Sequence, residues 1–246
     1  LVEQMQRRQF PVICCNVIEK ATGKLVPFAE PYRIFTHNGF KVGVIGIDTP
    51  ETPSISVAKN VKDIEFLEPE KPVKNLVKKL RKSGVDFIIL LSHLGYEADL
   101  KFVEKVGGID LILGGHSHTL LSQVTRAGPE KTPIIHSGAS LEHTSAVRIL
   151  LRKDAPPQTE MKSHPLYLDE IGYDMGVALV EEEYLRDIRA EMARVLGSSK
   201  VNLYRGVNGG DSPEGSFIAD AMRKAANTDF AFINFGGIRQ PLFKGE

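Results

Sequence analysis

The chain has 246 residues, of which 42% are hydrophobic, enough to bury the core of one full domain and part of a second. Its 31 basic and 31 acidic residues cancel, so the net charge gives no electrostatic basis for a nucleic-acid or membrane-surface partner. No apolar run approaches the roughly 18–20 residues that cross a membrane. We therefore expect no nucleic-acid partner and no transmembrane segment.

The first 50 residues predict a buried strand followed by a hairpin. The strand is Phe10–Val17, and Cys14 and Cys15 within it would point to opposite faces, which disfavours a disulfide between them. The hairpin strands are Pro31–Thr36 and Phe40–Ile47. They flank an Asn-Gly pair, the strongest short signal for a hairpin turn.

A helix and a βαβ unit follow a polar, proline-containing stretch, residues 49–69, that predicts a loop or short helices. The helix begins at Pro72 and ends at Gly84, with apolar residues at helical spacing and lysines on the other face. Two short apolar runs, Val85–Leu91 and Ile109–Leu113, read as buried parallel strands. The segment between them carries Leu100, Val103 and Val106 at helical spacing, which completes the unit.

Each strand of this unit leads directly to histidine. His93 follows the first strand, and His116 and His118 follow the second on a turn that contains two glycines. A lone histidine at a strand end is usually a satisfied polar residue. Three of them at neighbouring strand ends, where ligands bind in open α/β sheets, instead favour a metal site for Zn, Mn, Fe or Co.

The next part of the chain predicts two further strands, Pro133–Ser137 and Ala146–Arg152, and a turn at Asp154–Thr159. Two more histidines in this part, His136 and His143, are interpreted as structural, and His164 is expected in an irregular stretch with no partner in view.

The last part predicts a long helix over Asp174–Leu196, a second helix over Phe217–Ala226 and a short strand over Asp229–Ile233. Asn234-Phe235-Gly236-Gly237-Ile238-Arg239 follows. The two glycines would let the backbone approach a ligand closely, and the planar guanidinium of Arg239 suits phosphate.

These motifs resemble a known family. Ser92-His93-Leu94-Gly95 and Gly114-Gly115-His116-Ser117-His118-Thr119 are similar to the last two metal motifs of the calcineurin-like metallophosphoesterases, in the 5′-nucleotidase and 2′,3′-cyclic phosphodiesterase branch. Asp211-Ser212-Pro213-Glu214-Gly215 with the later Asn-x-Gly-Gly-x-Arg resembles the start of the 5′-nucleotidase C-terminal domain.

The resemblance implies an α/β fold in which a layered α+β sheet sandwich precedes a linker helix and the start of a second α/β domain. The expected boundaries are 1–172 for the metallophosphoesterase-like domain, 173–197 for the linker and 198–246 for the nucleotide-binding domain. It also implies an enzyme that removes phosphate from nucleoside 5′-monophosphates or related nucleotides, located outside the cytoplasm in the periplasm, in the medium or at the cell surface.

The resemblance further assigns roles to individual residues. His93 and His116 would bind one of two divalent ions (Zn, Mn or Co), and His118 the other. The nucleotide substrate would be contacted by Asn234, Gly236, Gly237, Arg239 and, as a weaker candidate, Arg205.

The family's D-x-H and G-N-H-E motifs do not occur in this sequence. No catalytic residue is therefore predicted within the chain; the catalytic histidine would lie upstream of Leu1, and we expect residues 1–246 by themselves to show weak or no hydrolase activity. Two alternatives stay open: a 2′,3′-cyclic-nucleotide phosphodiesterase, or a non-catalytic nucleotide-binding relative. The sequence does not specify the base, the metal or the oligomeric state.

Overall fold

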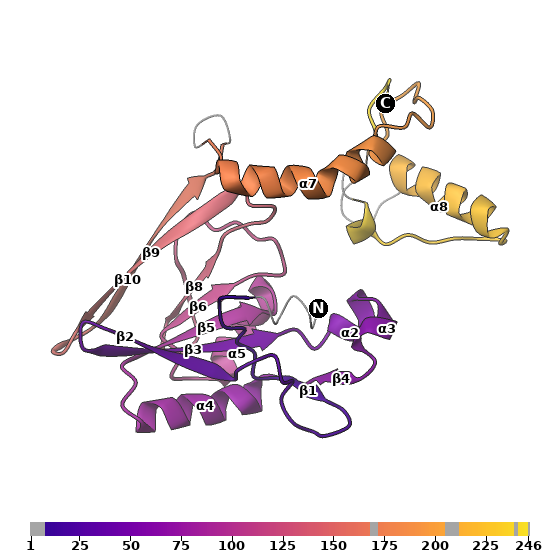
Figure 1. Ribbon diagram of the computed structural model, residues 1–246. Coiled ribbons are helices and arrows are strands. Elements are labelled where there is room, and N and C mark those ends of the chain that lie inside the picture. Colours follow the sequence, from indigo (N-terminus) through magenta and orange to yellow (C-terminus); the bar gives the residue numbers. More distant parts are fainter. Residues whose placement is uncertain (1–7, 168–171, 205–211, 239–240, 246) are drawn as a thin grey trace. The chain divides into compact units, whose positions relative to one another are not determined.

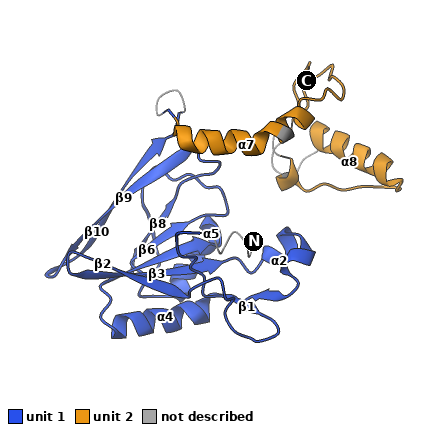
Figure 2. Cartoon of the chain, in the orientation of Figure 1, with its two compact units in different colours: residues 1–172 blue, residues 173–246 orange. Residues whose placement is uncertain are grey.

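The computed structural model describes residues 8–167, 172–204, 212–238 and 241–245, and the chain divides into two compact units, residues 1–172 and 173–246 (Figure 2). The elements of the first unit are β1 (Val17–Glu19), β2 (Tyr32–His37), β3 (Phe40–Asp48), α2 (Thr52–Ile55), α3 (Ala58–Val61), β4 (Ile64–Phe66), α4 (Glu70–Lys82), β5 (Phe87–His93), α5 (Tyr96–Lys105), β6 (Leu111–Gly114), β7 (Thr125–Ala127), β8 (Thr132–His136), β9 (His143–Arg152) and β10 (Ala155–Pro165). Those of the second unit are α7 (Met175–Met192), α8 (Pro213–Ala226) and the 3₁₀ turn η1 (Phe235–Gly237).

A six-stranded mixed sheet in the order β2-β3-β5-β6-β8-β7 forms the centre of the first unit (Figure 1). Its four middle strands are parallel, and the two edge strands pair antiparallel to their neighbours. This arrangement confirms the predicted α/β class. The parallel strands are almost wholly apolar because both of their faces are covered.

Different layers cover the two faces of the sheet. On one face, α4 and α5 pack against the strands in a cluster that includes Val73, Leu80 and Phe102. On the other face, Phe87, Leu111 and Ile135 contact apolar side chains of the β9–β10 ribbon. Figure 1 shows α4 and this ribbon on opposite sides of the sheet.

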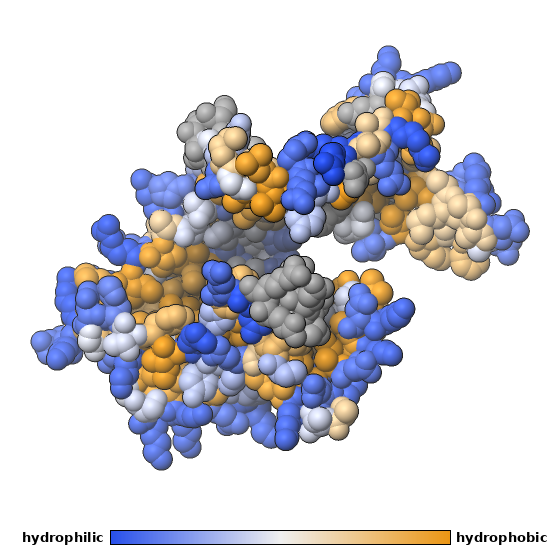
Figure 3. Space-filling model, in the orientation of Figure 1, coloured by the Kyte–Doolittle hydropathy of each residue, from blue (hydrophilic) through white to orange (hydrophobic). Residues whose placement is uncertain are grey.

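Helix α4 confirms its predicted periodicity, although it begins at Glu70 rather than Pro72. Val73, Val77 and Leu80 are buried in the core, while the lysines point to solvent, as the blue lower edge of Figure 3 shows. Gly84 ends the helical segment with a φ of 77°, a conformation that glycine adopts without strain.

The predicted hairpin is confirmed, but the predicted strand before it is wrong. Residues 10–17 contain only an isolated bridge between Ile13 and Glu30 before β1 begins. The main chain here follows an irregular path close to β3, with Cys15 N donating to Gly46 O at 2.8 Å. Its main-chain hydrogen bonds therefore go one by one to a loop and to β3. The strand β1 pairs with β4, which lies in the polar stretch where no strand was predicted.

The turn predicted at 154–159 is also misplaced. Residues 153–154 make the turn, and the strand β10 begins at Ala155 and contains Pro156 and Pro157. Proline is tolerated because β9 and β10 form a two-stranded ribbon, and the register shifts between Ala155 and Gln158 where the prolines lie. The same strand includes His164, which was expected in an irregular stretch.

In the second unit, α7 is capped by the Asp174 side chain, which accepts hydrogen bonds from Gly176 N and Val177 N. It ends at Met192, four residues before the predicted limit. Residues 229–233 do not form the predicted strand, because no strand in the described part of the chain pairs with them. Phe230 and Phe232 in this segment are exposed, with their rings 5.6 Å apart.

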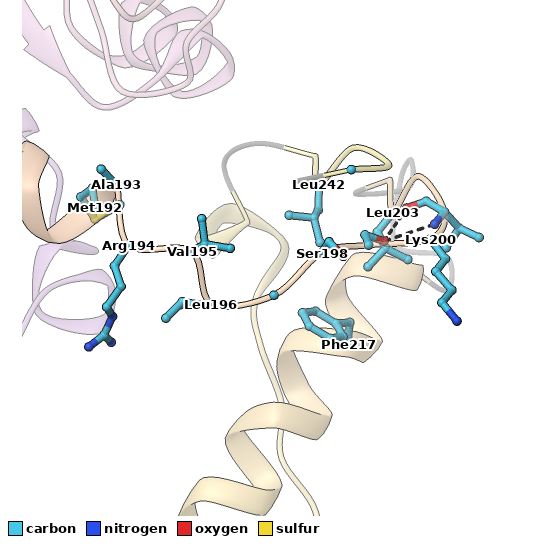
Figure 4. A pocket seen from close by; sticks show the side chains of 14 residues that line it. Met192, Ala193, Arg194, Val195, Leu196, Ser198, Lys200, Leu203, Phe217 and Leu242 are labelled. Carbon is cyan, nitrogen blue, oxygen red and sulfur yellow. Dashed lines mark hydrogen bonds between the residues drawn. The ribbon is translucent and has the colours of Figure 1, made fainter.

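A hollow of about 850 Å³ opens in the second unit between the segment after α7 and the start of α8 (Figure 4). Apolar side chains such as Val195, Leu203 and Phe217 line it, and it contains none of the histidines. In the part of the chain that the structure describes, no helix is long and apolar enough to span a bilayer.

Gly46→Ala should destabilise the first unit by about 1–3 kcal/mol or more. A Cβ built on Gly46 would lie 1.9 Å from the carbonyl oxygen of Ile13, which is main chain and cannot rotate away. Urea unfolding measures the loss. Gly43→Ala, in the same strand, is the matched control: its Cβ meets only the side-chain ends of Leu80 and Val85 at 3.1 Å and should cost less. Equal losses would contradict the close crossing at Gly46.

Candidate functional site

The paired histidines lie where two parallel strands end. His93 is the last residue of β5, and His116 follows β6 by two residues. Because β5 and β6 are neighbours in parallel register, with Ser92 opposite Gly114, their ends meet at one edge of the sheet. The rings of His93 and His116 approach to 5.0 Å between centroids, tilted by 57°. His93 is exposed and His116 half-buried, so both are accessible to a ligand.

The loop that carries His116 and His118 is fixed by hydrogen bonds to β5 and α5. Gly115 N donates to Ser92 O at 2.9 Å, and Tyr96 N donates to Ser117 Oγ at 3.0 Å. Within this loop His116 and His118 have φ values of 79° and 56°. Two non-glycine residues in the left-handed region store backbone strain, and strain of this kind collects at functional sites.

Two glycines of the motifs lie against the histidine pair. Gly95 has a φ of 96°, and a Cβ there would lie 3.4 Å from Ser117 Cβ and 3.6 Å from His116 Cδ2. A Cβ on Gly115 would lie 3.4 Å from His93 Nδ1. The two sequence motifs thus contact each other through their glycines as well as their histidines.

The donor chemistry at this edge fits a divalent transition metal, since neutral imidazole is a common ligand for such ions. The described residues hold a pair of converging imidazoles, however, and no group of three or more His, Cys, Asp or Glu side chains among them is arranged to hold an ion. His118 lies on the same loop, two residues beyond His116, and is exposed. Among the described residues, the candidate site therefore consists of two converging imidazoles.

Asn16 supports the neighbouring strand end. Its buried amide donates to Asp48 O at 2.8 Å and Leu67 O at 2.7 Å and accepts from Asp48 N at 2.9 Å. Asp48, at the end of β3, is the register partner of His93. These hydrogen bonds fix a loop and a strand end, so Asn16 has a structural role.

Titratable groups elsewhere in the first unit have structural roles. Burial raises the pKa of the Cys15 thiol to about 12, so this residue is a buried apolar group and not a nucleophile. Burial also raises the pKa of Asp110, against the opposing effect of hydrogen bonds from Ile88 N and Arg81. Asp110 lies before β6, at the opposite end of the sheet from the histidines.

Sequence reasoning missed one buried polar cluster beside this edge. Asp99 of α5 is fully buried and contacts His136 Nε2 at 2.9 Å, while its other oxygen accepts a hydrogen bond from Ser92 Oγ. His136 was interpreted as structural. Neither residue belongs to one of the family motifs, and 37 residues separate them. The one available signal was a carboxylate on the buried face of the helix predicted between the two strands.

In the second unit, Asn234 folds over the glycine pair. Gly237 N donates to Asn234 O at 2.9 Å, and a Cβ on Gly237 would lie 2.8 Å from Asn234 Oδ1. Asn234, Gly236 and Gly237 are all exposed. The predicted substrate contacts Arg205 and Arg239 lie outside the described residues.

The turn with the glycine pair is attached to the start of α8. Ile238 is buried, and Gly215 lies beside it with space for its Cδ1. Ser212 caps the helix by accepting from Gly215 N at 2.9 Å. Glu214 in the same turn is 5% exposed, and its Oε2 has no hydrogen-bond partner within the described ranges. Sequence reasoning did not single out this buried carboxylate.

Comparisons with known proteins agree with the motifs. Residues 195–246 match the family model described as 5′-nucleotidase, C-terminal domain. The crystal structure of a 5′-nucleotidase precursor from Thermus thermophilus has a TM-score of 0.84 with 26% identity, covering 100% of this chain and 52% of that protein. The resemblance to the 5′-nucleotidases is confirmed. The chain shares the metallophosphoesterase-like fold of that structure.

Two relatives from Bacillus subtilis are not named as 5′-nucleotidases. Endonuclease YhcR is 30% identical over 252 residues, covering 97% of this chain and 20% of the relative. The trifunctional nucleotide phosphoesterase protein YfkN is 28% identical over 265 residues, covering 97% of this chain and 18% of the relative. This 5′-nucleotidase-like chain therefore spans about half, or much less, of the length of the proteins that it matches.

Gly95→Ala should destabilise the first unit by about 1–3 kcal/mol, because alanine is strained at a φ of 96°. It should also displace the ring signals of His116 in NMR spectra, because the new methyl group contacts that side chain. Gly84→Ala is the matched control: it has a φ of 77° with no atom within 4 Å, so it shares the strain and should leave the histidine signals unchanged. Identical His116 spectra in both variants would contradict the contact.

Proposed function

We propose that the protein containing this chain hydrolyses phosphate esters of nucleotides, as a 5′-nucleotidase-like hydrolase that removes phosphate from nucleoside 5′-monophosphates. The observation that carries the proposal is the approach of His93 and His116, 5.0 Å between ring centroids, at the ends of two parallel strands. The resemblance to 5′-nucleotidases along the whole chain supports it.

In this proposal His93 and His116 bind one divalent ion and His118 contributes to a second, the ions being Zn, Mn or Co. Such ions supply Lewis-acid polarisation of phosphate oxygens. The chain's own residues orient the ligands: the loop after β6 presents its imidazoles in a fixed, strained conformation, and the bonds to Ser92 and Tyr96 hold it there. The other ligands and the catalytic histidine are proposed to lie outside residues 1–246.

The second unit is proposed to bind the nucleotide. The exposed turn of Asn234, Gly236 and Gly237 offers an amide side chain and accessible main chain to a substrate. Arg239, and less strongly Arg205, complete the proposed contacts with phosphate. We also propose an extracytoplasmic location, periplasmic, secreted or at the cell surface, as the family resemblance implies.

His116→Ala in the full-length protein should reduce metal-dependent phosphate release from AMP by at least roughly 100-fold, since even outer-shell partners of a metal typically cost 10–100-fold. A colorimetric phosphate assay at saturating Mn²⁺ or Co²⁺ measures this. His37→Ala is the control, because His37 is exposed at the β2–β3 turn, remote in sequence from the motifs. Full activity in His116→Ala would overturn the assignment.

The relatives' names favour one further substrate test. One is named a nucleotide phosphoesterase and another an endonuclease, so nucleic acid joins the cyclic nucleotide of the phosphodiesterase alternative as a rival substrate. We expect AMP to be hydrolysed with a higher kcat/KM than 2′,3′-cyclic AMP or single-stranded DNA. Preference for the cyclic diester would favour the phosphodiesterase alternative. Nucleotide binding without turnover of any of the three would favour the non-catalytic alternative.

A further inference from the structure

Ser92, Gly114 and His136 form one row across three neighbouring parallel strands. The register pairs Ser92 of β5 with Gly114 of β6, and Gly114 with His136 of β8. Residues paired in this way point to the same face of a sheet. Helix α5 contributes Asp99 above the row, and the carboxylate contacts both outer members, Ser92 Oγ and His136 Nε2.

The middle member of the row must be glycine for this bridge to exist. A Cβ on Gly114 would lie 2.1 Å from His136 Nε2 and 2.5 Å from Asp99 Oδ2. The space that a side chain would fill is occupied by the hydrogen bond between Asp99 and His136. One carboxylate therefore spans the strand that lies between its two partners.

The hydrogen bonds define the chemistry of the cluster. Ser92 Oγ donates to one oxygen of Asp99, and His136 Nε2 lies 2.9 Å from the other, to which it donates in the tautomer that carries the proton on Nε2. His136 Nδ1 is buried and has no hydrogen-bond partner among the described residues, which suits a lone pair better than an N–H group. Both side chains are inaccessible, 1% exposed for His136 and 0% for Asp99, so the bridge is shielded from water.

The cluster is connected to His93 and His116, the proposed metal ligands, through short covalent and hydrogen-bonded links. Ser92 immediately precedes His93, and its carbonyl accepts from Gly115 N, the residue before His116. Tyr96 packs edge-on against the His136 ring at 5.6 Å and holds Ser117 through its main-chain N–H. Any shift of β5 relative to β6 and β8 would thus change the distance between the two imidazoles.

We propose that Asp99 is a positioning residue for the metal site: by bridging Ser92 and His136 across Gly114 it fixes the separation of His93 and His116. The inference rests on the proposed function only in taking these two histidines as metal ligands. Asp99 acts on both of them through the strand ends.

Asp99→Asn tests the proposal in the full-length protein. The amide still accepts from Ser92, but its NH₂ group faces His136 Nε2. The bridge to β8 then persists only in the tautomer that buries an unpartnered Nδ1–H, so it is weakened. We expect the affinity for Zn²⁺, measured by isothermal titration calorimetry, to fall about 10–100-fold. In the metal-free protein, the NMR ring signals of His93 and His116 should shift. KM for AMP should stay within about twofold while kcat falls, because the proposed nucleotide contacts lie in the second unit.

Two further variants keep the test decisive. Ser92→Ala removes one arm of the bridge and leaves the buried contact between Asp99 and His136 intact. It should show the same changes at smaller amplitude even if Asp99→Asn folds poorly. Thr132→Val is the matched control: Thr132 is a buried polar residue of β8 that donates to Ile109 O at 3.2 Å, near the start of the strand. It should lower stability without altering Zn²⁺ affinity or the histidine signals.

The outcomes separate the two proposals. The positioning role is refuted if the Asp99→Asn and Ser92→Ala variants fold, keep wild-type Zn²⁺ affinity and leave the ring signals of His93 and His116 unchanged. If the wild-type protein binds no metal but the ring signals still shift in the variants, the positioning role is supported and the proposed metal site is refuted. Equal effects from Thr132→Val would show that general destabilisation explains the loss, which also refutes the positioning role.

Discussion

The pairing of β5 with β6 is the constraint on which the site depends. The first residues of both strands are buried on both faces, so their register is fixed by packing against the helices on one side and the β9–β10 ribbon on the other. A slip of one residue would move every core side chain to the wrong face and would separate His93 from His116. The packing of apolar residues thus sets the separation of the two histidines.

Three glycines lie at close contacts within this candidate site. Gly95 and Gly115 lie in contact range of the histidines of the opposite motif, and Gly114 leaves the space in which the Asp99 carboxylate meets His136. The motifs therefore contribute packing contacts as well as the proposed ligands.

Much of the first unit could be predicted from sequence because its signals are local. The helix α4, the Asn-Gly hairpin and the βαβ unit each carry a period or a turn signal within a short stretch. The predictions failed where partners were distant: residues 10–17 bond to a loop and to β3, β4 pairs with β1, and β10 tolerates two prolines only because its partner is a single strand. The segment 229–233 has strand composition, but no strand of the described residues pairs with it.

The candidate site shows the same division. The strand-end histidines were found because their spacing follows two obvious strands, whereas Asp99 and His136 became visible only when the fold placed α5 over β8. Arg205 and Arg239 stay predictions. The complete ligand set stays a proposal as well, since residues 8–167 and the other described ranges supply two converging imidazoles and no three-ligand cluster.

The most direct test is a crystal structure of the full-length protein grown with Zn²⁺ and measured at the zinc absorption edge. We predict an anomalous peak about 2.0–2.1 Å from one ring nitrogen each of His93 and His116, the usual zinc–imidazole distance. A peak elsewhere in the protein, with these two rings uncoordinated, would contradict the central claim that parallel strand ends build the metal site.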